Sequence, residues 1–144
     1  MTARIAGLTR YLKKGEPGEA LSEAELLEGL GMKGDRRQGG ERQISLLSAE
    51  ARKWMDSRDE PGLCFGKFRE NILIEGLSPR ELTEGSRLSV GKAVLRVSTG
   101  GKHCYAECEL ISREEDCLLA GGAVFASVER GGTVCVGDVA MQMY

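Results

Sequence analysis

The segment RLSVGKAVLRV, residues 87–97, is the most informative stretch of the chain for its fold. Two short apolar-rich segments, residues 87–90 and 93–97, flank the pair Gly91-Lys92. A two-residue link that begins with glycine is typical of a tight turn between antiparallel strands. The segment therefore predicts a β-hairpin.

Similar short apolar segments lie on both sides of this hairpin. Residues 3–8, residues 44–46 and an apolar run at 72–74 are each expected to form a strand. A second hairpin is expected at Gly131-Gly132, followed by a turn at Gly137-Asp138 into a closing strand at 139–141. Twenty glycines separate these segments at fairly regular spacing, which suits a barrel or a sandwich.

Helix signals are few. Ser48 can cap a helix that carries Ala51, Trp54 and Met55 on one face, and a cap followed by proline at residues 78–79 predicts a short helical turn. At residues 22–25 a capping-box pattern competes with the nearby glycines 29, 31 and 34, so a helical turn and a strand are equally expected there. The predicted class is mainly β with one or two short helices.

Composition favours one ordinary globular domain spanning residues 1–144. The chain is 41% hydrophobic and 29% charged, and its apolar runs are too short for a membrane span or a signal peptide. Its net charge of −2 offers no overall field to attract nucleic acid. We therefore expect a soluble cytoplasmic protein without nucleic-acid or membrane partners.

The chain has five cysteines, an odd number that suits free thiols in a cytosolic protein better than a disulfide framework. Cys104, Cys108 and Cys117 fall close together, whereas Cys64 and Cys135 stand alone. Cys135 lies between two valines, which predicts an inert core residue. The residues around Cys64 indicate neither an inert core residue nor a reactive one.

Cys104 follows two glycines, Lys102 and His103 at the end of an expected strand. A neighbouring positive charge favours the thiolate, which is both nucleophilic and metal-binding. Adjacent residues of an extended chain point to opposite faces, so a dyad of His103 and Cys104 is not expected. A zinc site that adds Cys108, Cys117 and His103 stays open, although C-x-x-x-C is looser than the usual pairs. Cys108 and Cys117 can equally assist Cys104 as resolving thiols.

A second cluster is the glycine-rich stretch KGDRRQGGERQ, residues 33–43. Its cations can surround an oxyanion with guanidinium forks, or the stretch can be a solvated loop whose charges pair with one another. Its glycine spacing is neither a P-loop nor a dinucleotide fingerprint, so a nucleotide enzyme is not expected. Asn71 is the only asparagine, and its amide can both donate and accept hydrogen bonds.

Taken in order, these segments resemble the MOSC domain, the module also found at the carboxyl terminus of molybdenum-cofactor sulfurases. The resemblance covers nearly the whole chain, and Cys108 and Cys117 are similar to those of small stand-alone bacterial members. The residues that carry it are Gly34-Asp35-Arg36, residues 42–47, Glu70-Asn71-Ile72, Gly85, Val90-Gly91, Lys102 with Cys104, Val124-Phe125-Ala126, Gly131-Gly132 and Gly137-Asp138.

The resemblance implies a closed β-barrel-like fold with a pocket for the molybdenum cofactor (molybdopterin) or a sulfur-bearing intermediate. It also implies that Cys104 is the reactive or molybdenum-ligating residue. Pyridoxal phosphate is associated with larger relatives but is not expected to bind this chain. Two positions depart from the family pattern, since Arg36-Arg37 stands where a histidine is frequent and Ala123 where a glycine is common.

The leading hypothesis is a cofactor-handling module in which the Cys104 thiolate ligates molybdenum or carries sulfur. The residues expected to hold the cofactor are Arg36, Arg37, Arg42, Gln43, Asn71 and Lys102. Molybdenum-cofactor biosynthesis proteins or molybdoenzymes are the expected partners, and sulfur transfer or a molybdenum-dependent reduction is the expected activity if the chain is an enzyme. The alternatives are a molybdenum-independent thiol redox or sulfur-transfer enzyme and a zinc-stabilised binding domain.

Overall fold

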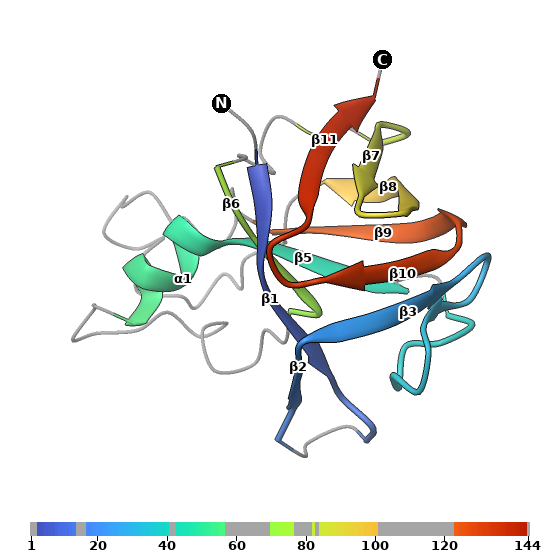
Figure 1. The fold of residues 1–144 in the computed structure, drawn as a ribbon, viewed down its shortest axis with the longest axis horizontal. Coiled ribbons are helices and arrows are strands. Elements are labelled where there is room, and N and C mark those ends of the chain that lie inside the picture. Colours follow the sequence, from blue (N-terminus) through green and yellow to red (C-terminus); the bar gives the residue numbers. More distant parts are fainter. Residues whose placement is uncertain are drawn as a thin grey trace, which may run out of the picture.

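The computed structural model describes residues 3–13, 17–40, 43–56, 70–76, 82, 84–100 and 123–143. These residues form mostly strands and one helix (Figure 1). In chain order the elements are β1 Ala3–Arg10, β2 Glu19–Leu21, β3 Glu23–Leu27, β4 Gly31–Met32, β5 Ile44–Ser48, α1 Ala49–Asp56, β6 Ile72–Glu75, β7 Arg87–Val90, β8 Ala93–Gly100, β9 Ala123–Arg130, β10 Gly132–Cys135 and β11 Val139–Met143.

Seven strands form a closed barrel, which confirms the fold that the family resemblance implied. They are hydrogen-bonded in the order β11-β7-β8-β9-β5-β6-β1, and the barrel closes because β1 pairs with β11 at Ala3 and Ala140. Closure leaves no open edge between these strands. In Figure 1, β1 and β11 accordingly lie side by side. The β5–β6 pair is parallel and the other pairs in the ring are antiparallel.

The hairpin at residues 87–97 is confirmed. Strands β7 and β8 pair in register from Val90 and Ala93 at the turn. Gly91 has φ +54°, a left-handed backbone conformation that glycine adopts without the steric penalty of a side chain.

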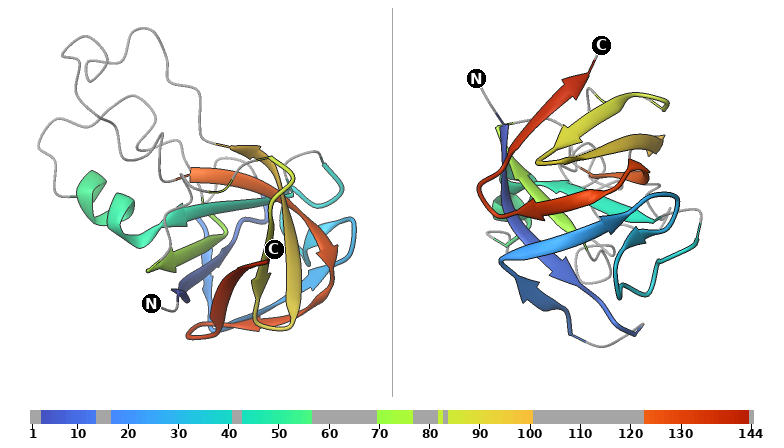
Figure 2. Two further views of the ribbon diagram at one scale, coloured as in Figure 1. Left: turned by 90° about the horizontal axis from the view of Figure 1, so that it is seen from above. Right: turned by 45° about the vertical axis from the view of Figure 1, so that its right-hand side comes forward.

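A second, three-stranded sheet, β10-β3-β4, lies beside the barrel (Figure 2, right). Residues 23–27 are therefore a strand, which settles the two equal expectations for that segment. The expected hairpin at Gly131-Gly132 is wrong, because β10 pairs with β3 and not with β9. The two glycines instead lie where the chain passes from β9 of the barrel to β10 of the second sheet. A Cβ on Gly131 would lie 2.7 Å from the carbonyl oxygen of Leu26, so only glycine passes at this distance.

The one helix of the described chain begins where the sequence placed it. The Ser48 hydroxyl accepts a hydrogen bond from the amide of Ala51 at 2.9 Å, which satisfies one of the free donors at the helix start. Ala51 is buried, whereas the side chains of Trp54 and Met55 lie outside the described residues, as does the turn expected at 78–79. The helix continues directly from β5 and lies outside the barrel (Figure 2, left). No helix in the described ranges is long and apolar enough to cross a bilayer.

The barrel interior is filled by aliphatic side chains from all seven strands. The alternation expected at residues 44–46 is only partly visible, because all five residues of β5 are buried. Ile44 and Leu46 belong to the core, while Ser45 faces outward and is covered by other parts of the chain. What covers Ser45 is the feature on which the candidate site is built.

Candidate functional site

Asp35, in the basic loop at residues 33–40, is an acid buried inside that loop. Its side chain is 4% exposed and accepts three hydrogen bonds. One oxygen accepts from the amide of Tyr11 at 2.9 Å and from the side-chain amide of Asn71 at 2.8 Å, and the other accepts from the amide of Arg37 at 2.9 Å. A buried carboxylate with this many donors is well compensated for its lost hydration.

Asn71 joins this carboxylate to the barrel wall. Its side-chain oxygen accepts from the amide of Ser45 at 3.0 Å and from the Ser45 hydroxyl at 3.1 Å. Its nitrogen donates to the carbonyl of Thr9 at 3.1 Å in addition to Asp35. A side-chain amide has two donors and two acceptor positions, so all four are used. The Ser45 hydroxyl in turn accepts from the Asn71 backbone amide at 2.9 Å.

The Asp35–Asn71–Ser45 cluster therefore ties the basic loop to β1, β5 and the start of β6. Fully satisfied buried networks of this kind stiffen the segments that they connect. Asp35 and Ser45 belong to the motifs that carry the family resemblance, but the sequence predicted no role in the site for either residue. The missed signal was a polar residue between the apolar core residues Ile44 and Leu46 of the strand 44–48.

Arg37 is the loop cation that this cluster positions. Its backbone amide binds Asp35, and its guanidinium lies over the ring of Phe125 on β9, 5.5 Å from the centroid. This is the distance range of a cation–π contact. Arg36 is exposed, and its amide donates to the carbonyl of Tyr11 at 2.7 Å. The loop thus presents two guanidinium groups, one resting on an aromatic ring and one in solvent.

The hydrogen bonds of the Gln43 side chain do not involve this network. Its side-chain nitrogen donates to the carbonyl of Gly29 at 3.0 Å, and its oxygen accepts from the amide of Val128 at 3.1 Å. It therefore joins β9 to the turn at Gly29. The predicted binding roles of Gln43 and Asn71 stay predictions, and their contacts here are with the protein itself.

The other predicted site residues, Arg42, Lys102 and Cys104, lie outside the described residues, as do His103, Cys64, Cys108 and Cys117. Within the described part, no group of three or more histidine, cysteine or acidic residues could hold a metal ion.

The strand register nonetheless relates Arg37 to the segment that carries Cys104. Phe125, which supports the Arg37 guanidinium, pairs with Thr99 on β8, and the next pair is Val124 with Gly100. Gly100 is the last residue of β8. The Arg37–Phe125 contact therefore lies one residue pair from the strand end that leads along the chain to Lys102 and Cys104.

Cys135 differs from its predicted core role. The residue is free and only half-buried, and its sulfur lies 4.0 Å from a carboxylate oxygen of Glu23 on β3. Successive side chains of a strand point to opposite faces, and Val134 takes the core position in β10. The flanking valines thus indicated a buried strand but not which of its residues faces inward.

Comparison with protein families identifies the family of this chain. The family model described as "MOSC domain" matches residues 33–140, which include the basic loop, Asn71 and the strand end before Cys104. The chain belongs to the MOSC domain family. This family is linked to enzymes of the molybdenum cofactor.

Solved structures similar to this MOSC domain support the same fold. The YuaD protein from Bacillus subtilis matches with a TM-score of 0.73 at 22% identity, covering 100% of this chain and 97% of that one. YiiM from Geobacillus stearothermophilus matches with a TM-score of 0.66 at 13% identity, covering 99% and 75%. YiiM from Escherichia coli matches with a TM-score of 0.60 at 21% identity, covering 98% and 70%. A search of curated proteins found no match.

Proposed function

We propose that this MOSC domain binds the molybdenum cofactor, or a sulfur-bearing intermediate of it, through a thiolate at Cys104. Arg37 is the described residue best placed to hold an anionic group such as the cofactor's phosphate. The observation that carries the proposal is the Arg37–Phe125 contact, which the Asp35–Asn71–Ser45 cluster supports beside the end of β8.

The residues of the loop fit a phosphate. Guanidinium groups bind phosphate oxygens through paired N–H donors, and a guanidinium that rests on a ring loses less freedom on binding than one in solvent. Arg36 adds a second guanidinium from the exposed side of the loop. Asn71 supports the site by holding the loop to the barrel, and Gln43 joins β9, which carries Phe125, to the turn at Gly29.

Cys104 follows Gly100 by four residues, and four residues of chain span at most about 14 Å. A thiolate joined by this short segment to the strand end beside the Arg37–Phe125 contact suits a ligand that is anionic at one end and reacts at the other. Lys102 adds a positive charge on the same segment, which favours the thiolate form. When bound, the cofactor would supply a molybdenum centre to which a soft thiolate is a suitable ligand.

The test is the molybdenum and phosphorus content of protein purified from cells that make the cofactor. Arg37→Ala should lower the retained cofactor about tenfold, the loss expected for one charge-assisted pair of hydrogen bonds. Arg130→Ala, which removes an exposed arginine at the far end of β9, should retain it. Cys104→Ser should lose molybdenum.

Other results would contradict the proposal in different ways. Equal cofactor content in Arg37→Ala and Arg130→Ala would show that the basic loop is only a solvated surface. Sulfur labelling at Cys104 in protein that never binds molybdenum would favour molybdenum-independent sulfur transfer. Zinc that protects Cys104, Cys108 and Cys117 together from alkylation would favour the zinc-stabilised domain. If the proposal holds, its partners are proteins that make or use the molybdenum cofactor.

A further inference from the structure

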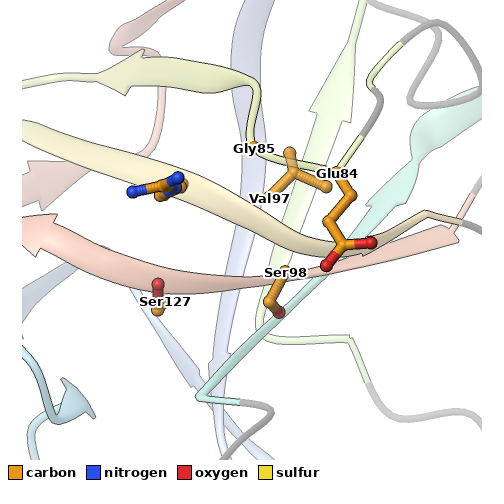
Figure 3. A pocket seen from close by; sticks show the side chains of 6 residues that line it. Glu84, Gly85, Val97, Ser98 and Ser127 are labelled. Carbon is orange, nitrogen blue, oxygen red and sulfur yellow. The ribbon is translucent and has the colours of Figure 1, made fainter.

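A hollow of about 490 Å³ lies on the outer face of β8 and β9, beside the turn at residues 84–86. It is lined by Glu84, Gly85, Arg96, Val97, Ser98 and Ser127. Figure 3 shows the turn above β8 and the two serines on neighbouring strands. The turn is fixed to β8 by two backbone hydrogen bonds of 2.8 Å, from the amide of Gly85 to the carbonyl of Val97 and from the amide of Val97 to the carbonyl of Ser86.

Ser98 sits at an irregularity of the strand pairing. The register with β9 shifts between Val97 and Thr99, so Ser98 is an extra residue on β8. Its hydroxyl oxygen is buried at the wall of the hollow and has no hydrogen-bond partner in the described structure. A buried hydroxyl without a partner lowers stability, and strand bulges are frequent beside ligand sites.

Arg96 provides a positive charge that the described residues do not neutralise. It pairs in register with Arg87 on one side and with Ser127 on the other. Like charges directly opposite one another on neighbouring strands are unfavourable. Arg87 is compensated by Glu129 at 2.8 Å, whereas Arg96 forms no ion pair with the described part of the chain.

We infer that this hollow is an anion site, in which Arg96 and the hydroxyls of Ser98 and Ser127 bind the oxyanion of a small phosphorylated molecule. An anion would supply the missing counter-charge of Arg96, and it would supply the missing partner of the buried Ser98 hydroxyl once that side chain rotates toward the hollow. Glu84 also lines the hollow, and its carboxylate repels a second negative charge and accepts a hydrogen bond, so the ligand carries one anionic group and a neighbouring hydroxyl. This inference does not depend on the proposed molybdenum function.

The hollow also lies close to the Arg37–Phe125 contact. Ser127 and Phe125 are two residues apart on the same outward face of β9, a separation of about 7 Å in a strand. A molecule bound in the hollow would therefore lie beside the proposed cofactor site.

The test is a titration of the isotope-labelled full chain with inorganic phosphate and with glycerol 3-phosphate, followed by backbone amide NMR at constant ionic strength. The amides of Gly85, Ser98 and Ser127 should shift on saturation. Arg96→Ala should weaken binding of both probes at least tenfold, Ser98→Ala at least threefold, and Arg130→Ala less than twofold. Glu84→Gln should remove the preference for glycerol 3-phosphate over phosphate.

A second Arg96 variant and a salt control complete the test. Arg96→Lys retains the charge without the guanidinium fork, so it should bind phosphate more weakly than the parent and more tightly than Arg96→Ala. The inference is overturned if sodium chloride causes the same shifts, or if both Arg96 variants bind like the parent. Cofactor loss in Arg37→Ala with phosphate still bound at Ser98 and Ser127 would separate this site from the proposed function.

Discussion

Two serines on the outer face of the barrel have opposite surroundings. The Ser45 hydroxyl is fully buried and makes two hydrogen bonds with Asn71. The Ser98 hydroxyl is buried at the wall of the hollow and makes none with the residues described. A hydroxyl stabilises the folded state only when its bonds to water are replaced, so the same residue type has opposite effects at the two positions.

Serine-to-alanine substitutions at these positions should change stability in opposite directions. Ser45→Ala removes the hydroxyl's two hydrogen bonds with Asn71, although both Asn71 groups keep a bond to the Ser45 backbone, and should lower the free energy of unfolding by about 1 kcal/mol. Ser98→Ala removes an unpaired hydroxyl and should raise it by about 1 kcal/mol. Urea denaturation with the slope m compared between variants measures both. A loss of stability in Ser98→Ala would show that its hydroxyl is satisfied in solution.

At the scale of elements, the path of the chain after β9 distinguishes this fold from a simple meander. β10 leaves the barrel to pair with β3, and β11 returns to close the ring between β1 and β7. The crossing depends on close passage of backbones at Gly131, where a Cβ would meet the carbonyl oxygen of Leu26 at 2.7 Å. Gly7 in β1 has more room, because a Cβ there would meet Leu73 at 3.6 Å, an ordinary contact.

Glycine-to-alanine substitutions at these two positions should therefore differ. Gly131→Ala forces two backbone segments apart and should cost about 2–4 kcal/mol, in the range of overpacked or strained sites. Gly7→Ala should change stability by less than about 1 kcal/mol, since the methyl group fits and the unfolded chain loses freedom. Thermal unfolding followed by circular dichroism compares them. A Gly131→Ala variant as stable as Gly7→Ala would mean that the second sheet shifts easily against the barrel.

At the scale of the whole molecule, the barrel depends on contact between the two ends of the chain. Ala140 on β11 is 1% exposed and pairs with Ala3 on one side and Val90 on the other. The next residue, Met141, is 57% exposed on the opposite face of the same strand. The face of β11 that carries Ala140 therefore packs into the barrel, and the face that carries Met141 is solvent-exposed.

Charge introduced on the two faces should test this closure. Ala140→Asp places a carboxylate without a partner in the core and should cost at least about 3 kcal/mol, with loss of the single cooperative unfolding transition if the ring opens. Met141→Asp should cost less than about 0.5 kcal/mol, as surface substitutions usually do. Calorimetry and amide exchange of β1 would report the difference. Similar stability in both variants would show that β11 is not needed to close the barrel.

Local sequence was sufficient for the features whose causes are local. The hairpin at 87–97 follows from a glycine in a two-residue turn, and the helix start from the Ser48 cap. The family and its barrel could be recognised because motifs such as residues 34–36 and 70–72 occur in a specific order. These features depend on neighbours in the chain or on the order of motifs, and both can be read from one sequence.

Tertiary structure alone decided which strands pair and which polar groups meet. The glycines at 131–132 fit a hairpin and a crossing between sheets equally well, and only the position of β3 selects the crossing. The burial of Ser45, the saturation of Asn71 and the contact of Arg37 with Phe125 join residues from distant parts of the chain. Side-chain pairing across a barrel depends on strand order and register, and local residue patterns do not encode either one.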